Sequence, residues 1–262
     1  MISSLLPSFI NPANRRINLD SLRTLNFSVI LPVCNQSDHI ESVVRRHIEF
    51  LQERTEVPFE IILVVNGCTD DSLRVCRLLE ENLEVVRVVD SERAGWGAAV
   101  QEGMKAAGGS HICYASSARA KSEDIVDLIN CAASRPDVVV HAIRKGHDNP
   151  LRSLSSYFYN LECRVLHGIQ VRDVNGNPKI FPRKFERLLE LEEEGYLVDV
   201  EFNVVCTEND YPVVQRAVRH TKRHGGKSMT GFLVGASLYF QVFNLWLRRT
   251  FKKRRNVLKQ ES

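Results

Sequence analysis

The sequence has no C-x-x-C pair, and its cysteines are scattered and odd in number. A zinc site of paired cysteines and a disulfide framework both need regular spacing, so we expect neither. Scattered thiols are typical of a protein in a reducing compartment, where most of them serve as small buried side chains. The seven cysteines are Cys34, Cys68, Cys76, Cys113, Cys131, Cys163 and Cys206.

The chain also lacks a strong net charge, a long low-complexity tract and a basic region before its first apolar residues. A formal charge of +3 gives little support to nucleic-acid binding, and we expect no nucleic-acid partner. The start, MISSLLPSFINPANRR, does not resemble a secretory signal, which favours a cytoplasmic location. With 262 residues, 44% of them hydrophobic, the chain can bury the core of one ordinary domain.

What the sequence does contain is an alternation of short apolar runs and helix-like segments. FSVILPVCN at 27–35 and EIILVVNGCTDD at 60–71 are rich in Val and Ile, and polar turn residues end each run. Between them, apolar residues recur at helical spacing from Ser37 to Glu53. Such a unit gives two parallel strands, with a ligand site at their carboxyl ends. We therefore expect a nucleotide near Asn35 and residues 66–70.

The same alternation continues and predicts a three-layer α/β fold with a mostly parallel sheet. Segment 197–207 reads equally as helix or strand. We expect an N-terminal arm at 1–26, one domain at 27–229 and a tail at 230–262. Further strands are predicted at 83–90, 111–117, 137–144, within 172–183 and at 212–218, and further helices at 94–107, 122–133, 151–166 and 183–194.

Four motifs follow one another in an order that resembles a known family. They are FSVILPVCNQ, EIILVVNGCTDDS, RAGWGAAVQEGMKAAGG and HTKRHGGKS. Their succession is similar to that of family-2 glycosyltransferases with the A-type (GT-A) fold, nearest the dolichol- or polyprenyl-phosphate sugar synthases. The resemblance implies inverting transfer of a sugar from a nucleotide-diphosphate donor, with UDP or GDP, to a polyprenyl phosphate or a membrane-linked glycan.

In the resembling enzymes, the first two strand ends hold the donor nucleoside. Two adjacent Asp usually end the second strand, but Val65 and Asn66 stand at those positions here. Asn66 can donate to and accept from a base or ribose, whereas Val65 has no polar side-chain atom. Asp70 either supplies a carboxylate to the donor or caps the next helix. The resemblance thus implies donor contacts at Pro32, Val33, Asn35, Asn66 and Asp70.

The larger departure from the family lies at the end of the fourth strand. The resembling enzymes carry Asp-x-Asp there, and its carboxylates hold Mg²⁺ or Mn²⁺ against the diphosphate. In this chain Ala115, Ser116 and Ser117 occupy the acidic triplet, and Arg119 stands at the position of a third ligand. Alanine has no ligand atom, and hard divalent cations prefer carboxylate oxygens, so we expect the usual metal site to be absent.

Several interpretations of this departure are open. In one, Arg119, with Lys121, offsets the charge of the leaving diphosphate directly, and transfer is metal-independent. In a second, the protein is a catalytically silent nucleotide-sugar-binding or scaffold protein. In a third, these two cations only form a solvated loop. In a fourth, Asp70 or Asp173 rescues weak metal binding.

Two glycine-containing segments complete the donor side in this resemblance. Gly95 and Gly97 flank Trp96 at the start of a helix, where the backbone either faces the donor or packs the helix. HTKRHGGKS is similar to a late H-x-x-R-x-x-G-x-S signature whose loop closes over the donor phosphates, and a solvated basic loop is the alternative. The predicted donor contacts therefore also include Gly95, Gly97, Ser116, Ser117, Arg223 and Lys227.

The acceptor side of the resemblance rests on basic and acidic residues of the second half. Arg144 and Arg152 match positions where polyprenyl-phosphate sugar synthases keep basic residues, which implies binding of a lipid phosphate. Three acidic residues match acidic positions, and a carboxylate there can deprotonate a hydroxyl acceptor, whereas a phosphate acceptor needs no base. The sequence does not choose among them, and Asp173 is equally a turn residue. The candidate catalytic residues are Arg119, Asp173, Asp199 and Glu201.

The tail combines an apolar helix with basic residues. From Gly231 to Leu247 the sequence is strongly apolar, with a narrow polar stripe that recurs at helical spacing up to Arg248. This length is at the lower limit for crossing a bilayer, and the stripe argues against a lone span. Seven of the 35 Lys and Arg lie between Arg248 and Lys259 and suit anionic headgroups. We expect an amphipathic helix that lies on the cytosolic face of a membrane or mediates self-association, and packing on the domain's own core is the alternative.

Overall fold

The computed structural model describes residues 26–145, 150–219 and 232–260. The predicted arm, apart from Asn26, and the motif HTKRHGGKS lie outside these residues.

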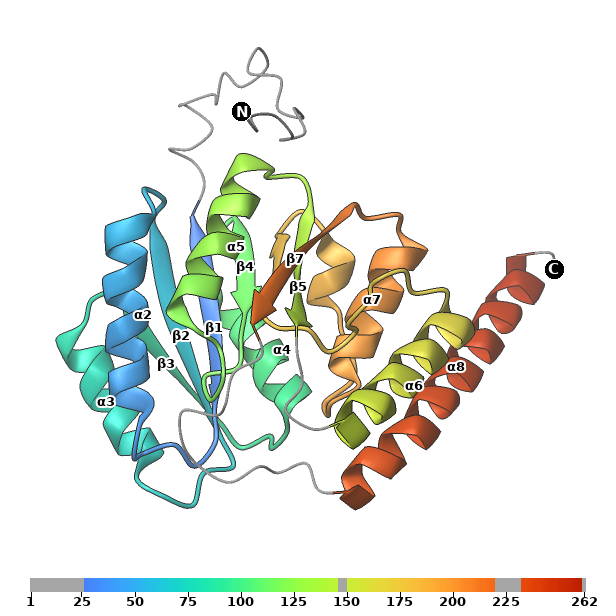
Figure 1. Cartoon of the computed structure of the whole chain (residues 1–262), viewed down its shortest axis with the longest axis horizontal. Coiled ribbons are helices and arrows are strands. Elements are labelled where there is room, and N and C mark those ends of the chain that lie inside the picture. Colours follow the sequence, from blue (N-terminus) through green and yellow to red (C-terminus); the bar gives the residue numbers. More distant parts are fainter. Residues whose placement is uncertain (1–25, 146–149, 220–231, 261–262) are drawn as a thin grey trace, which may run out of the picture.

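A seven-stranded sheet forms the centre of the described chain (Figure 1). Its order is β3-β2-β1-β4-β6-β5-β7. Only β6 runs antiparallel to its neighbours β4 and β5, whereas the other pairs are parallel, which confirms the predicted mostly parallel sheet. The strands are β1 (Phe27–Val33), β2 (Phe59–Asn66), β3 (Val86–Ser91), β4 (His111–Tyr114), β5 (Val139–Lys145), β6 (Lys179–Pro182) and β7 (Val213–Arg219).

Helices cover both faces of the sheet, which explains why the central strands are apolar throughout. Helices α2 (Ile40–Arg54), α3 (Ser72–Asn82) and α5 (Ser122–Ser134) share one core cluster with Val29 and Leu31 of β1. Helices α4 (Trp96–Ala106) and α7 (Val198–Glu208) share another with Ile30. Neighbouring residues of β1 therefore enter opposite layers, as the period of two along a strand requires.

The predicted helix at 183–194 is wrong. Only a short 3-10 turn, η2 (Glu186–Leu189), forms there, and residues 190–195 have no regular structure. Their backbone is held by tertiary contacts instead: the Glu192 and Glu193 N–H groups donate to the Glu201 carboxylate, and the Glu194 carbonyl accepts from the Ala98 N–H. Segment 197–207, for which both readings were open, is helix α7.

Two further helices, α6 (Pro150–His167) and α8 (Phe232–Gln260), lie side by side at one end of the domain (Figure 1). The alternative of packing on the domain's own core is confirmed for one face of α8, because Val242 and Leu245 are buried against Tyr159 and Cys163 of α6. Within the described ranges, no helix combines the length and apolar character needed to cross a bilayer.

Close packing of α4 on β1 gives a test of this fold. A Cβ added at Gly103 would lie 2.3 Å from Ile30 Cγ2, deep in the core. We expect Gly103→Ala to lower the free energy of unfolding by about 1–2 kcal/mol, because the overpacking cost exceeds the gain in helix propensity. Gly195→Ala is the matched control, since nothing lies within 4 Å of its added Cβ. Equal urea midpoints for the two variants would contradict this packing.

Candidate active site at the strand ends

The carboxyl ends of β1 and β2 are tied together by short polar contacts. Asn35 has a positive φ of 51° and is exposed, and its Oδ1 accepts from the Thr69 N–H at 2.7 Å. The Val33 carbonyl accepts from the Cys68 thiol at 3.4 Å. Pro32 and Val33 are buried in β1. The structure thus brings together the strand ends at which the sequence predicts a nucleoside.

Asn66, at the end of β2, is bonded to the turn that leads into α4, where Gly95 caps the helix and Gly97 lies in its first turn. The Asn66 side-chain amide donates to the carbonyls of Arg93 and Gly95 at 3.2 and 2.8 Å. Gly95 has a φ of 125°, and a Cβ added there or at Gly97 would lie 2.6 or 2.1 Å from the carbonyls of Glu194 and Glu193. Packing against the 190–195 segment therefore accounts for both glycines, which is the second of the two interpretations given above.

Asp70 links the turn after β1 to the start of α3. Its Oδ2 accepts from the backbone N–H and hydroxyl of Ser37, and its Oδ1 accepts from those of Ser72. Burial tends to raise the pKa of Asp70, but these hydrogen bonds outweigh it and lower the pKa to about 2. The carboxylate is therefore ionised near neutral pH. Asp71 is the N-cap residue of α3 but makes no capping hydrogen bond, and Asp70 accepts from the N–H of Ser72, the first residue of the helix.

Ala115 and Ser117, which stand where the resembling enzymes have Asp-x-Asp, are buried in the protein interior. Ala115 is fully buried, and Ser117 is 1% exposed. The Ser117 hydroxyl donates to the Pro32 carbonyl and accepts from the Gln36 side-chain amide at 2.8 Å. These residues do not fit a divalent cation, because the one buried hydroxyl is committed to the sheet end and no carboxylate is present. Ser116 and Arg119 are half-buried in the following turn, where the Ser116 carbonyl accepts from the Arg119 N–H at 3.0 Å.

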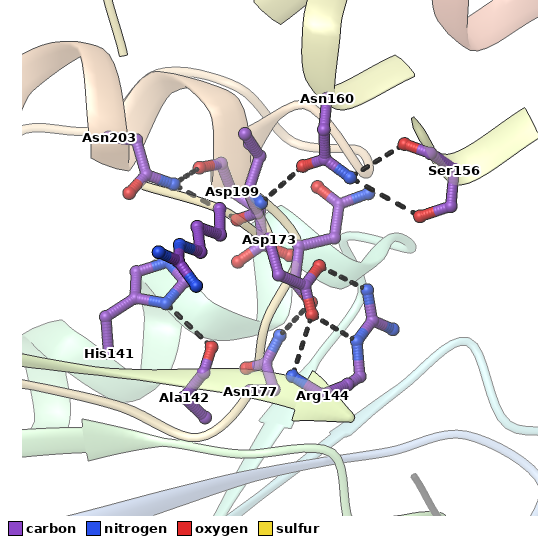
Figure 2. A network of polar contacts seen from close by, with 12 residues as sticks. His141, Ala142, Arg144, Ser156, Asn160, Asp173, Asn177, Asp199 and Asn203 are labelled. Atoms are coloured by element: carbon purple, nitrogen blue, oxygen red, sulfur yellow. Dashed lines mark hydrogen bonds and ion pairs between the residues drawn. The ribbon is translucent and has the colours of Figure 1, made fainter. Parts of the chain in front are cut away.

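In the other half of the sheet, Arg144 and Asp173 form a bidentate ion pair at the end of β5 (Figure 2). The Arg144 Nε and Nη2 donate to Asp173 at 2.8 and 2.7 Å, and the Arg144 backbone N–H adds a third bond. Burial tends to raise the pKa of Asp173, but Arg144 lowers it below its usual range. The Arg144 side chain is 32% exposed and has five N–H donors, of which Asp173 takes two, so it can bind a second anion.

A second ion pair, between Lys179 of β6 and Asp199 of α7, lies deeper in the same network. Lys179 is completely buried, and its ammonium group contacts the rings of Tyr114 and Phe202. Asp199 also accepts from the Tyr114 hydroxyl at 3.1 Å and from the Trp96 indole N–H at 3.2 Å. Asp199 therefore joins β4, β6 and the glycine turn before α4.

Glu201, the third acidic candidate, faces a different neighbourhood. Its Oε2 accepts from the Glu192 and Glu193 N–H groups at 2.8 Å, and its Oε1 lies 3.6 Å from Arg249 of α8. Burial raises its pKa above the usual value, against the effect of these hydrogen bonds. None of the three acids is an isolated carboxylate, and the role of general base stays a prediction for each.

Sequence reasoning missed two buried polar residues of this network, His141 and Lys179. The His141 Nδ1–H donates to the Ala142 carbonyl at 2.8 Å, and burial lowers the His141 pKa to about 3, so the ring is neutral. A single polar residue inside an apolar strand, as in VVVHAIR and PKIFP, was the available signal. Asn160 of α6 completes the network, because its Oδ1 accepts from the Val174 N–H at 2.7 Å, next to Asp173 (Figure 2).

Other predicted site residues are outside what the structure describes. Arg223 and Lys227 lie in the segment 220–231, and the side chain of Arg152 is also outside the described part. Across residues 26–145, 150–219 and 232–260, no group of three or more His, Cys, Asp or Glu side chains is arranged to hold a metal ion.

The sequence matches a known protein family and several known proteins. A family model described as Glycosyl transferase family 2 matches residues 28–188. A dolichyl-phosphate beta-glucosyltransferase of Drosophila melanogaster is 25% identical over 88% of this chain and 77% of its own length. An undecaprenyl-phosphate 4-deoxy-4-formamido-L-arabinose transferase of Sodalis glossinidius is 22% identical over 82% and 66%.

Among solved structures, the chain is similar to glucosyl-3-phosphoglycerate synthase from Mycobacterium tuberculosis in complex with Mn²⁺, uridine diphosphate and phosphoglyceric acid. The TM-score is 0.68 at 18% identity, with 88% of this chain and 80% of the other covered. At this identity the likeness shows the fold, which is the GT-A fold.

The buried ion pair supplies a test of the site's architecture. We expect Lys179→Met to lower the free energy of unfolding by about 3–5 kcal/mol, because Asp199 is left buried without its cation. Adding Asp199→Asn to that variant should recover much of the loss. Lys184→Met, in the exposed pair with Asp137, is the control and should cost less than about 1 kcal/mol. Additive losses in the double variant, measured by urea unfolding, would show that the two residues do not act as a pair.

Proposed function

This chain belongs to glycosyl transferase family 2 and is a glycosyltransferase, and we propose that it moves a sugar from a nucleoside-diphosphate donor to a polyprenyl phosphate. The observation that carries the proposal is Arg144. Its guanidinium is fixed by Asp173 at the carboxyl end of β5, is partly exposed, and has donors left for a phosphate. The similar proteins of fly and Sodalis, which are named for transfer to dolichyl and undecaprenyl phosphate, support this acceptor class.

The donor is a sugar linked to UDP or GDP, held at the ends of β1 and β2. Asn35 is exposed there, and Asn66, whose amide nitrogen donates to the Arg93 and Gly95 carbonyls, can accept from the donor with its side-chain oxygen. Asp70 and Ser116 lie near these strand ends and are further donor contacts in this proposal, whereas Pro32 and Val33 are buried and can only support the strand end. Ser117 contributes indirectly, because its hydroxyl holds Gln36 and Pro32 in place.

The reaction is an inverting displacement at the anomeric carbon. An acceptor phosphate oxygen forms a new bond to the anomeric carbon. The bond between that carbon and the nucleoside diphosphate breaks, and its electron pair leaves with the diphosphate. A phosphate is already ionised near neutral pH, so the step needs no base. This agrees with three candidate acids that are each engaged by a cation or by backbone N–H groups.

The leaving diphosphate gains negative charge, and side chains of this protein offset it. Arg119 and Lys121 follow the end of β4, and Arg223 and Lys227 belong to the late basic motif. A guanidinium binds phosphate through two parallel hydrogen bonds and keeps its charge at any physiological pH. Preorganised positive charge of this kind lowers the barrier without a divalent ion. Because the acceptor is carried by a lipid, the enzyme works at a membrane surface, on the cytosolic face.

Arg144 provides the test of the acceptor assignment. We expect Arg144→Lys to raise the KM for a water-soluble short-chain polyprenyl phosphate about tenfold or more, because an ammonium group cannot bind both Asp173 and phosphate through a planar fork. Arg144→Ala should raise it further, since the unpaired Asp173 then repels the phosphate. The KM for the donor should stay unchanged in both.

Arg87→Ala is the control for loss of a cation, because Arg87 pairs with Glu60 on the far side of the sheet. An acceptor KM that is equal in wild type and Arg144→Lys, with the donor KM raised, would move Arg144 to the donor side. Failure of every UDP or GDP sugar to react would favour a silent nucleotide-sugar-binding protein instead.

A further inference from the structure

We infer that the outward faces of α6 and α8 together form a docking surface for an anionic lipid bilayer. This inference rests on the proposed function, because it explains how a lipid-borne phosphate reaches Arg144. It assigns a role to α6, which the sequence does not set apart from other amphipathic helices. The docking face is defined by Leu154, Tyr157, Phe158, Leu161 and Val165 of α6 and by Phe240, Phe243, Leu247 and Phe251 of α8.

On α6, the exposed side chains follow helical spacing and lie opposite the buried ones. The five residues of the docking face on α6 recur at intervals of three and four and are 36% to 73% exposed. Tyr159, Asn160 and Cys163, between them in sequence, are buried on the other side of the helix. Large apolar side chains gathered in one patch of this kind are unusual on a protein without a partner.

On α8, three faces are distinct. Val242 and Leu245 are buried in the core cluster shared with α6 and α7. The polar stripe, with Gln241, Asn244 and Arg248, lines a groove of about 630 Å³ together with Glu193, Leu197 and two residues at the edge of the docking face, Leu247 and Phe251. The third face carries Phe240, Phe243 and Phe251, which are 68%, 41% and 63% exposed.

The two apolar faces point away from the domain on the same side. Both helices bury their inner faces in one cluster with Leu197, Val200 and Val204, and they contact each other there. The Tyr239 hydroxyl donates to the Ser155 carbonyl at 2.6 Å, and the Tyr159 and Tyr239 rings meet edge to face. Because α6 and α8 lie side by side (Figure 1), we treat the faces opposite their shared cluster as one outer surface.

Charge decides which partner this surface fits. Seven Lys and Arg lie between Arg248 and Lys259, in the last turns of α8. Arg248 and Arg249 pair with Glu193 and Glu208 of the domain, and the other five follow Phe251 in sequence, so the end of the helix is strongly basic. An anionic bilayer fits both this basic end and the apolar docking face, because its headgroups attract the cations and its acyl chains receive the aromatic rings. A second copy whose α8 aligned in parallel would bring its own basic segment to the same place, and the like charges would repel, and no copy supplies the anionic groups that this segment attracts.

The docking face is also connected to the proposed phosphate site. Asn160 lies on the inner side of α6, and its Oδ1 accepts from the Val174 N–H, one residue after Asp173. Arg144 in turn is held by Asp173. A helix that lies on the membrane through one face thus braces the Arg144 ion pair through the other, and the lipid phosphate need not leave the membrane surface.

Vesicle flotation tests the inference without any turnover. We expect the full chain to float with phosphatidylcholine vesicles that contain phosphatidylserine, and to float about tenfold less with phosphatidylcholine alone or in high salt. Phe158→Ser and Phe240→Ser, one on each helix, should each lower the partition coefficient about tenfold, and the double variant about a hundredfold. Leu78→Ser is the matched control, because Leu78 is 47% exposed on α3, away from the docking face. Circular dichroism melting curves confirm that the variants fold.

Two outcomes would overturn the inference. Flotation of Phe158→Ser and Phe240→Ser at the wild-type level would show that the rings do not enter a bilayer. If the wild type does not float and is a dimer by light scattering, while the two variants are monomers, a second copy covers the face. Transfer to the water-soluble acceptor separates this inference from the proposed function: it should be unchanged in both variants, and its absence in wild type, with flotation intact, would refute the function and leave the docking surface standing.

Discussion

The buried ion pair between Lys179 and Asp199 is the contact on which the rest of the site depends. It joins β6, the one antiparallel strand of the described sheet, to α7, and through Asp199 it also holds Tyr114 of β4 and Trp96, the first residue of α4. A charged pair this deep is tolerated only when its remaining polar atoms are satisfied, and both rings around Lys179 and both donors to Asp199 meet that condition. The end of β4, strand β6, helix α7 and the start of α4 are therefore tied together at one carboxylate.

Other buried carboxylates near this pair are also balanced by cationic side chains of the same chain. Asp173 is balanced by Arg144, and Glu201 lies against Arg249. At the end of β4, where the resembling enzymes place metal-binding carboxylates, Ala115 and Ser117 pack the sheet end instead. This is the basis of our proposal that Arg119, Lys121 and the late basic motif, rather than a divalent cation, offset the charge of the leaving diphosphate.

Much of this fold could be predicted from sequence, because strands buried on both faces and amphipathic helices leave strong periodic signals. The parallel pair β1 and β2 is an example. The predicted helix at 183–194 was wrong because a local pattern does not reveal that the Glu192 and Glu193 N–H groups bond to Glu201. For the same reason the partners of Asp70 and the packing of Gly95 and Gly97 on residues 193–194 were not predictable. Lys179 was missed because the distance between β6 and α7 is a property of the tertiary structure alone.

The central claim is that this glycosyltransferase balances the charge of its donor with its own cations. The most direct measurement is the rate of sugar transfer by the purified protein from UDP and GDP sugars to a polyprenyl phosphate, with EDTA and then with added Mn²⁺. The account predicts equal rates under both conditions, and a loss of about 2–4 kcal/mol of transition-state stabilisation in Arg119→Ala, which is roughly thirtyfold to a thousandfold in rate. A rate that falls to background in EDTA and returns with Mn²⁺, while Arg119→Ala has no effect, would contradict it.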